Sequence, residues 1–275
     1  MESTELNHEP EANPAYRSGF FTHEQVAYLD NFRAIEWARH YKQRTFSYLN
    51  AKQGEHILEV GCGTGDDARL LAQTVGPRGK VVGIDAGQDM IAEANRRSEN
   101  LDLPIEFFVG DVHNLDFPDN TFDGCRADQV FQHVGDPRRG LSEMVRVARS
   151  GARIVICDPD WGTLAIDAED RDLTRRILTV RMDAFRSGWV GRQLPALFKE
   201  HGLKDLFVSA DTFILTDFVM ANRIWQLQKT TERAQKSGVI SQEEAARWLG
   251  GLEKANQQNL FFGAVTGFAV VGVKP

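Results

Sequence analysis

Short apolar runs and amphipathic segments alternate along residues 55–160 of the chain. Runs rich in β-branched residues predict strands, and apolar residues at helical spacing predict helices between them. The predicted strands lie at residues 56–60, 80–85, 105–110, 122–128 and 152–158. The predicted helices lie at residues 66–75, 87–99 and 137–149. This alternation predicts a parallel sheet covered on both faces, with the carboxyl ends of the strands at the edge where open α/β sheets bind ligands.

The flanking segments depart from this alternation. Residues 1–19 are polar and predict a flexible tail. Residues 20–50 predict one or two helices, which begin at a capping-box pattern at Thr22 and either pack on the edge of the domain or form a lid. The main domain is expected over residues 51–275. Two helical insertions that form a lid are expected at about residues 161–190 and 216–258. A helix is expected between them at about residues 192–202, and strands at about residues 203–215 and 261–273. A second capping box is predicted at Ser241.

Composition and charge narrow the class of protein. The 275 residues carry a net charge of -7, which disfavours a nucleic-acid partner because phosphate contacts require a basic face. The N-terminus lacks a signal pattern and the apolar run at residues 260–273 is too short to span a membrane, so we expect a soluble, cytoplasmic protein. Cys62, Cys125 and Cys157 fall in or beside predicted strands at spacings that match no zinc pattern, and nothing in the sequence requires a metal.

A glycine-rich turn follows the first predicted strand. The run from Glu59 to Gly65 reads E-V-G-C-G-T-G and leads directly into a predicted helix. Strand, glycine turn and helix form the entry unit of a nucleotide-binding domain. Asp66 stands where a dinucleotide site has its third glycine, which argues against a nicotinamide oxidoreductase. No Walker-type lysine follows either, so a phosphate-binding loop is not expected.

Acidic residues end the next two predicted strands. Asp85 can accept hydrogen bonds from vicinal ribose hydroxyls. Asp111 can accept from an exocyclic amine, and the Val112 N–H can donate to a ring nitrogen. Together with the glycine turn, these residues predict a pocket for an adenosine group without phosphates.

Residues 54–160 resemble class I S-adenosylmethionine-dependent methyltransferases, in particular the small-molecule group that includes the ubiquinone/menaquinone-type enzymes. The resemblance implies an α/β fold with a doubly wound, mostly parallel, seven-stranded, Rossmann-like sheet whose last strand is antiparallel. It also implies S-adenosylmethionine as cofactor and S-adenosylhomocysteine as product. Gly61, Cys62 and Gly63 would border the methionine part, and the Ala127 backbone would face its amino group. The other residues expected to bind the cofactor are Glu59, Gly65, Asp85, Ala86, Met90, Asp111 and Val112.

Three residues are candidates for a catalytic base, which is needed only where the acceptor atom is protonated. His133 follows the fourth predicted strand, Asp128 ends that strand, and Asp160 follows the fifth. Each of the three is also open to a structural role, and His133 in particular can simply cap or brace its turn. Arg181 and Arg186 either bind an acceptor carboxylate or lie on an exposed helix face. Six apolar residues of the insertions either line the lid or pack between helix and sheet: Trp161, Phe185, Trp189, Phe218, Met220 and Trp225.

The function expected from the sequence is methyl transfer to a small molecule, an aromatic or quinone-like specialised metabolite, at oxygen, nitrogen or carbon. One alternative keeps the reaction but takes RNA or protein as the acceptor. The other is an adenosyl-ligand-binding protein without catalytic activity. The expected partner is the small-molecule acceptor, without nucleic acid or a membrane span, and the pattern leaves a homodimer open.

Overall fold

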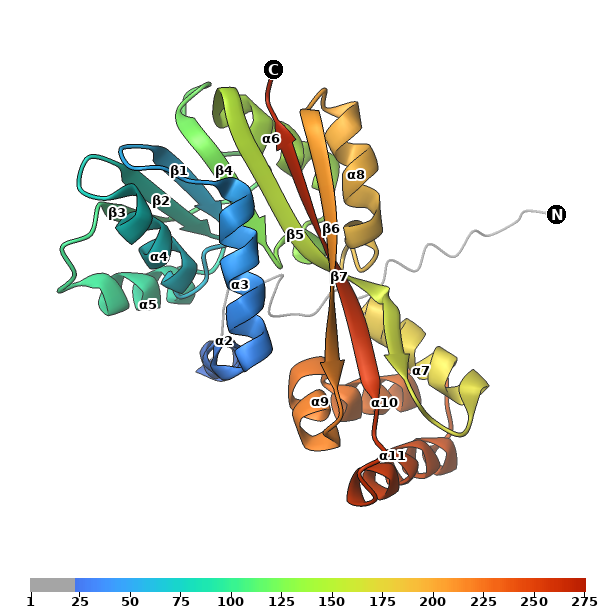
Figure 1. Ribbon diagram of the computed structural model, residues 1–275. Coiled ribbons are helices and arrows are strands. Elements are labelled where there is room, and N and C mark those ends of the chain that lie inside the picture. Colours follow the sequence, from blue (N-terminus) through green and yellow to red (C-terminus); the bar gives the residue numbers. More distant parts are fainter. Residues whose placement is uncertain (1–22) are drawn as a thin grey trace.

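The computed structural model describes residues 23–275, so the tail expected at residues 1–19 and the Thr22 cap lie outside the described residues (Figure 1). The strands form one seven-stranded sheet in the order β3-β2-β1-β4-β5-β7-β6. The first five strands run parallel, and β7 is antiparallel to both of its neighbours. The strands are β1 (His56–Val60), β2 (Lys80–Asp85), β3 (Ile105–Val109), β4 (Phe122–Asp128), β5 (Ala148–Ile166), β6 (Lys204–Leu215) and β7 (Gly263–Val273). The expected fold class is therefore confirmed.

Helices cover both faces of this sheet and form a separate lobe beyond it (Figure 1). The described helices are α2 (His23–Ala34), α3 (Glu36–Leu49), α4 (Asp66–Val75), α5 (Gln88–Ser98), the short 3-10 helix η1 (Phe131–His133), α6 (Pro137–Val147), α7 (Arg171–Asp183), α8 (Val190–Glu200), α9 (Phe218–Trp225), α10 (Leu227–Lys236) and α11 (Gln242–Gln257). Asp136 caps α6 through a bond from the Arg139 amide, and Ser241 and Glu244 form the expected capping box of α11. None of the described helices is long and apolar enough to cross a membrane.

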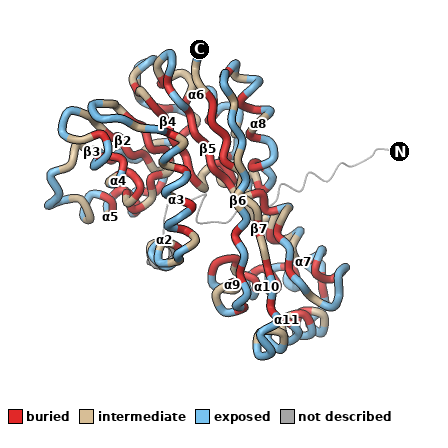
Figure 2. The backbone as a smooth tube through the Cα atoms, in the orientation of Figure 1, coloured by how far each residue is buried: buried red, intermediate tan, exposed pale blue. Residues whose placement is uncertain are grey.

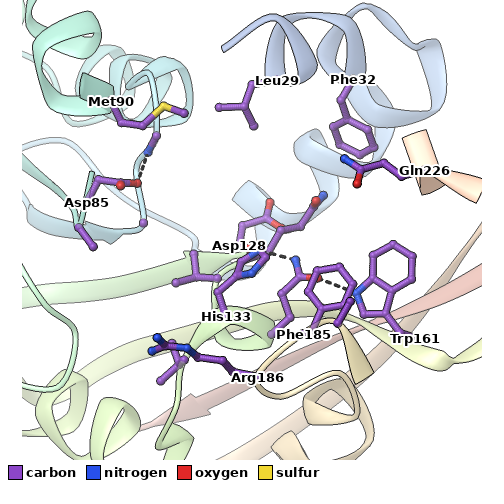
Figure 3. A pocket seen from close by; sticks show the side chains of 18 of the residues that line it. Leu29, Phe32, Asp85, Met90, Asp128, His133, Trp161, Phe185, Arg186 and Gln226 are labelled. Atoms are coloured by element: carbon purple, nitrogen blue, oxygen red, sulfur yellow. Dashed lines mark hydrogen bonds between the residues drawn. The ribbon is translucent and has the colours of Figure 1, made fainter. Parts of the chain in front are cut away.

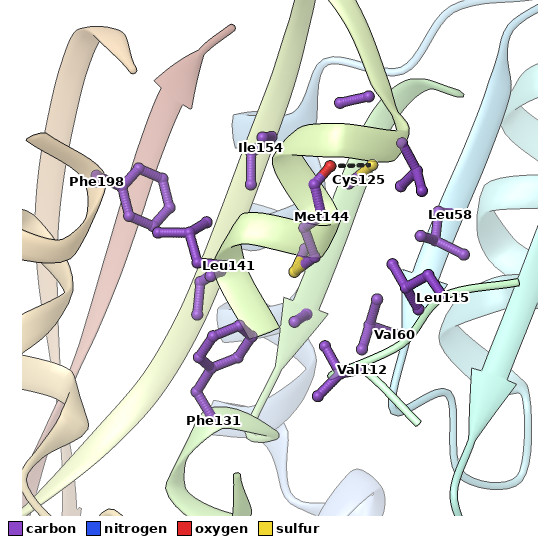
Figure 4. Packing of buried hydrophobic residues seen from close by; sticks show 14 of the residues in the cluster. Leu58, Val60, Val112, Leu115, Cys125, Phe131, Leu141, Met144, Ile154 and Phe198 are labelled. Atoms are coloured by element: carbon purple, nitrogen blue, oxygen red, sulfur yellow. Dashed lines mark hydrogen bonds between the residues drawn. The ribbon is translucent and has the colours of Figure 1, made fainter. Parts of the chain in front are cut away.

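Alternating side chains of the strands point to opposite faces, and each face has its own buried core. Figure 2 shows buried residues along the central strands, among them β4 and β5. Leu58 and Val60 of β1 pack with Leu141 and Met144 of α6, as Figure 4 shows. Ile57 of the same strand packs in the opposite core, whose helical residues come from α3, α4 and α5. Glu59 alternates with its neighbours in the same way and therefore lies on the α3 side of the sheet.

The ends of β5 and β6 and the beginning of β7 continue beyond the other strands and carry a helical lobe (Figure 1). The lobe is made of α7, α9, α10 and α11. Its core is a third buried cluster, in which Trp225 and Trp248 pack with Phe261. The first insertion was expected to begin at residue 161, but β5 continues to Ile166, which pairs with Gly263 of β7. Within the second insertion, α9 and α10 are separated at Gln226, whose φ of 52° is left-handed.

Candidate functional site

A cavity of about 1560 Å³ lies between the carboxyl ends of the parallel strands and the helical lobe (Figure 3). The sheet contributes the turns after β1, β2 and β4, as expected for an open α/β sheet. Leu29 and Phe32 of α2 close the cavity from above in Figure 3. We call the lining residues 161–233 the lobe side of the cavity, and those from Glu59 to Val134 the sheet side.

The glycine turn after β1 brings bare backbone to the sheet side of the cavity. Gly61 has φ of 66° and Gly63 has φ of 52°, in the left-handed region that only glycine adopts without strain. A Cβ at Gly61 would also overlap the side chain of Val130, which lines the cavity just before η1. A hydrogen bond fixes the turn to β2, because the Cys62 amide donates to the Ile84 carbonyl over 2.9 Å. A ligand can therefore approach the main chain closely at this turn.

Asp85 lies at the end of β2, next to the glycine turn (Figure 3). Its carboxylate accepts from the amides of Gly63 at 2.9 Å and Gly87 at 2.8 Å. Burial raises the pKa of this carboxyl, and the two amide bonds oppose the shift. Met90 and Val112 also line this end of the cavity and are buried. A fixed carboxylate above apolar side chains suits a ribose with a flat base beside it.

Asp111 is more exposed than Asp85. Its carboxylate accepts from the backbone amide of His113 at 2.9 Å and lies 2.6 Å from Nδ1 of the same residue. These bonds and the nearby Arg139 guanidinium lower its pKa, against the effect of partial burial. The turn is thus shaped locally, while the carboxylate remains at the cavity rim and open to a polar partner.

Charged residues lie buried beneath the glycine turn, on the α3 side of the sheet. Glu59 of β1 and Arg126 of β4 are partners in register, so both side chains point to this face and form an ion pair. Arg126 also binds the carboxylate of Asp128 at 2.6 Å and reaches Asp67 of α4 at 3.2 Å. Lys42 of α3 bridges Asp67 and Asp128 at 2.5 and 2.7 Å. We call these five residues the buried charge cluster.

When every member of the buried charge cluster is ionised, its five residues carry one negative charge more than positive, and Arg33 of α2 lies 3.7 Å from Asp67 as a further cation. The carboxyl groups of the cluster are Glu59, Asp67 and Asp128, against Lys42 and Arg126. The oxygen Oε2 of Glu59 is buried and has no hydrogen-bond partner among the described residues. Burial raises the pKa of the Glu59 carboxyl to about 8, although the Arg126 guanidinium favours the ionised form. Because Glu59 lines the cavity, a ligand ammonium group there would favour the ionised form of its carboxyl group.

An aromatic wall of Trp161, Phe185 and Arg181 faces the sheet side from the lobe (Figure 3 labels the two rings). The two rings stack with centroids 4.7 Å apart and an interplanar angle of 10°. The guanidinium of Arg181 lies 4.4 Å from the Trp161 ring centroid and 4.8 Å from that of Phe185. Trp161 is fixed by its Nε1–H, which donates to Gln132 over 2.7 Å. The wall is therefore rigid, flat and cationic.

His133 lies between the two sides of the cavity, with its ring 5.3 Å from that of Phe185 (Figure 3). Burial lowers the pKa of His133 to about 3, and the guanidinium groups of Arg181 and Arg186 contribute to the shift. The imidazole is therefore neutral at neutral pH. A neutral ring can accept a hydrogen bond from a hydroxyl group in the cavity.

Most of the residues expected at the site line the cavity together. They are Glu59, Gly61, Cys62, Gly63, Asp85, Ala86, Met90, Asp111, Val112, Asp128 and His133. Three expected residues lie outside the lining. Gly65 is the N-cap of α4 and packs against Phe107, and Ala127 is buried in the middle of the sheet. Asp160 is buried and forms an ion pair with Arg192.

Asp128 lines the cavity, but its carboxylate is already held by three donors. These are the Tyr41 hydroxyl at 2.7 Å, the Lys42 ammonium at 2.7 Å and the Arg126 guanidinium at 2.6 Å. Because three donors already occupy this carboxylate, the geometry gives Asp128 an anchoring role instead. Among the apolar residues of the insertions, Phe218 and Trp225 belong to the core of the lobe, and Trp189 is exposed.

Two groups of site residues did not emerge from the sequence. One is Lys42 and Asp67, which complete the buried charge cluster. The other is Arg223, Lys229 and Arg233, on helices far along the chain from the glycine turn. Only the first group left a signal in the sequence, because an arginine between Cys125 and Ala127 in a predicted central strand requires a buried anionic partner.

Comparison with known proteins places this site in a family context. A family model described as a methyltransferase domain matches residues 51–201. An uncharacterized 37.1 kDa protein in a transposon of Streptomyces fradiae is 39% identical over 249 residues, which is 90% of this chain and 71% of that protein. A demethylmenaquinone methyltransferase of Symbiobacterium thermophilum is 39% identical over 123 residues, 44% of this chain and 47% of that protein. The match thus spans about half the length of that characterised relative.

The fold also has solved counterparts. The crystal structure of the YcgJ protein from Bacillus subtilis superposes with a TM-score of 0.60 and covers 86% of this chain and 98% of its own. Sequence identity between the two is 16%, so this likeness concerns the fold.

Proposed function

Because the chain belongs to the methyltransferase family, we propose that it transfers a methyl group from S-adenosylmethionine to a small aromatic or quinone-like acceptor. The observation that carries the proposal is one cavity with two unlike sides. A glycine turn, Asp85 and a Glu59 oxygen without a hydrogen-bond partner among the described residues form the sheet side, and an aromatic wall forms the lobe side. This pairing supports a cofactor and an acceptor held face to face. The quinone-like class rests on the demethylmenaquinone methyltransferase relative.

The residues of the sheet side fit an adenosyl cofactor. Gly61 and Gly63 would border its methionine part, with Glu59 facing the amino group. Asp85 would hold the ribose, and Asp111 and Val112 would flank the adenine. Bound there, S-adenosylmethionine supplies an activated methyl group: an acceptor lone pair bonds to its carbon, the S–C electron pair returns to sulfur, and S-adenosylhomocysteine remains.

The residues of the lobe side would bind and orient the acceptor. The stacked rings of Trp161 and Phe185 offer a flat apolar surface to an aromatic compound. Phe32 of α2 lines the opposite wall, so an acceptor between them would be shielded from water. Positioning of this kind contributes about 7–11 kcal/mol to the lowering of a two-reactant barrier.

His133 is our candidate for the proton acceptor when the acceptor atom is a hydroxyl group. Its ring is neutral and lies at the junction of the two sides of the cavity. An imidazole whose pKa is about 3 is a weak base, but the arginines that lower it also favour an ionised phenol. His133 would thus orient the hydroxyl group and take its proton, with the guanidinium groups stabilising the oxyanion.

A turnover assay tests this function. Purified protein is incubated with S-adenosylmethionine carrying a labelled methyl group and a panel of phenols, hydroquinones and amines. The proposal predicts that label passes into one class of small molecule, with an equal amount of S-adenosylhomocysteine released. Binding of S-adenosylhomocysteine without transfer to any panel member, while RNA or protein accepts the label, would refute a small-molecule acceptor.

A further inference from the structure

The lobe side of the cavity is cationic in a chain whose net charge is -7. Its charged lining residues are Arg181, Arg186, Arg223, Lys229, Arg233 and Glu232. Among the described residues that line this side, five cations thus face one carboxylate. They come from the end of α7 and the loop after it, from α9 and from α10, so the fold gathers them from separate elements.

Other arginines of the lobe have acidic partners. Arg176 pairs with Glu244, Arg175 with Asp172, and Arg247 with Asp170. Arg186, Arg223 and Arg233, in contrast, form no ion pair with any described residue. Like charges gathered in a cavity repel one another, and an anion between them relieves that repulsion.

The arginine in the aromatic wall is held in place before any ligand arrives. Arg181 is 9% exposed, and its guanidinium plane is restrained by Trp161 and Phe185. A restrained planar fork loses little entropy when it binds a carboxylate or phosphate with two hydrogen bonds.

Arg186 follows in a loop that is tied to the turn after β4. The Ser187 amide donates to the Gln132 carbonyl over 3.0 Å, and the Ser187 hydroxyl donates to the Val134 carbonyl over 2.8 Å. These bonds keep Arg186 beside His133, as Figure 3 shows. His133 is therefore influenced by two guanidinium groups, that of Arg181 in the aromatic wall and that of Arg186 in the loop.

We propose that the acceptor is an aromatic compound bearing an anionic group, a carboxylate or a phosphate, which Arg181 and Arg186 bind while its ring lies against Trp161 and Phe185. The proposal rests on the proposed function and specifies the substrate class of the same cavity. Arg223, Lys229 and Arg233 extend the positive field toward α9 and α10. They draw anionic acceptors into the cavity and disfavour cationic ones.

Matched probes test the preference for an anion. The protein, saturated with S-adenosylhomocysteine, is titrated by calorimetry with 1-hydroxy-2-naphthoate and with its neutral amide, 1-hydroxy-2-naphthamide. We expect the carboxylate to bind at least about tenfold more tightly than the amide, since hydrogen bonds to a charged group are the stronger ones. A third probe, 1-naphthyl phosphate, separates the two sources of anion: tighter binding than the carboxylate assigns a phosphate, and weaker binding assigns a carboxylate.

Variants link the preference to the named residues. Arg186→Gln and Arg181→Gln should each reduce the carboxylate-to-amide ratio about tenfold. Arg175→Gln is the matched control, because Arg175 lies on α7 with a side chain that is 77% exposed and does not line the cavity. Thermal unfolding of each variant checks its fold. Arg186, in a loop and exposed, keeps the test decisive if loss of the buried Arg181 prevents folding.

The possible results distinguish a failure of this inference from a failure of the proposed function. If S-adenosylhomocysteine binds but the carboxylate binds no more tightly than the amide, including the case in which neither binds, the anionic acceptor is refuted and methyl transfer stands. An unchanged ratio in Arg186→Gln and Arg181→Gln refutes the role of these arginines. Failure of S-adenosylhomocysteine to bind at all refutes the proposed function, and the inference with it.

Discussion

Glu59 is a single carboxyl group held between a buried guanidinium and the cavity. One of its oxygens pairs with Arg126, and the other has no hydrogen-bond partner among the described residues. The family resemblance makes this residue part of a motif, but its burial and its raised pKa follow from the register of β1 and β4. At the residue scale, ligand binding should therefore be coupled to the charge on Glu59.

The coupling predicts a pH dependence of binding. Without ligand, Glu59 is protonated below its pKa of about 8. The ammonium group of S-adenosylhomocysteine favours the ionised form, so binding releases a proton and the affinity should rise about tenfold or more from pH 6 to pH 8. Calorimetry in buffers of different ionisation enthalpy measures both effects. Glu59→Gln should remove the pH dependence, and a dependence that persists in this variant would exclude Glu59 as its source.

His133 gives a second prediction at this scale. If its imidazole accepts the acceptor's proton, His133→Ala should lower kcat for a phenol by about 10²-fold or more. The loss should shrink for phenols that are already ionised at the assay pH, because they need no base. His201→Ala is the control, since His201 bonds to backbone carbonyls away from the cavity. An equal loss for ionised and neutral phenols would leave His133 with a purely structural role.

At the scale of elements, the sequence predicts the parallel part of the sheet closely. The bounds of β1, β2, β4 and α4 agree with the predicted ranges, because apolar runs and glycine or proline turns define them locally. The extension of β5 to Ile166 could not be predicted, since Pro159 and Gly162 signal a break and only pairing with β7 sustains the strand. The sequence also could not indicate Lys42 and Asp67, because they contact Arg126 and Asp128 only once α3 and α4 pack on the sheet.

The anchoring of α3 to β4 can be tested through Asp128. Asp128→Ala removes the partner of Lys42, Arg126 and the Tyr41 hydroxyl, and should lower the free energy of unfolding by about 3 kcal/mol, as expected for a broken buried ion pair. Asp211→Ala is the matched control. Asp211 pairs with Arg44 of α3, which is half-exposed, so loss of this pair should lower the free energy of unfolding by less than about 1 kcal/mol. Urea unfolding compares them, and equal losses would contradict the anchoring role.

At the scale of the whole molecule, the two sides of the cavity differ in how far sequence could predict them. The sheet side follows from the order of glycine turn and acidic strand ends, so most of its residues were expected. The lobe side depends on α7, α9 and α10 meeting across long sequence separations, so Arg223 and Arg233 became visible only in the folded chain. The proposed cofactor site is therefore supported by both the sequence and the fold, whereas the proposed acceptor site is supported by the fold.

The most direct test of the central claim is a calorimetric titration of the purified protein with S-adenosylhomocysteine and NAD side by side, repeated with Asp85→Ala. We expect micromolar binding of S-adenosylhomocysteine, no binding of NAD, and an affinity at least about tenfold lower in the variant, because the ribose loses a charged acceptor. Binding of NAD, or of neither compound, would contradict an adenosyl-cofactor site at the glycine turn, and an unchanged affinity in Asp85→Ala would remove Asp85 from it.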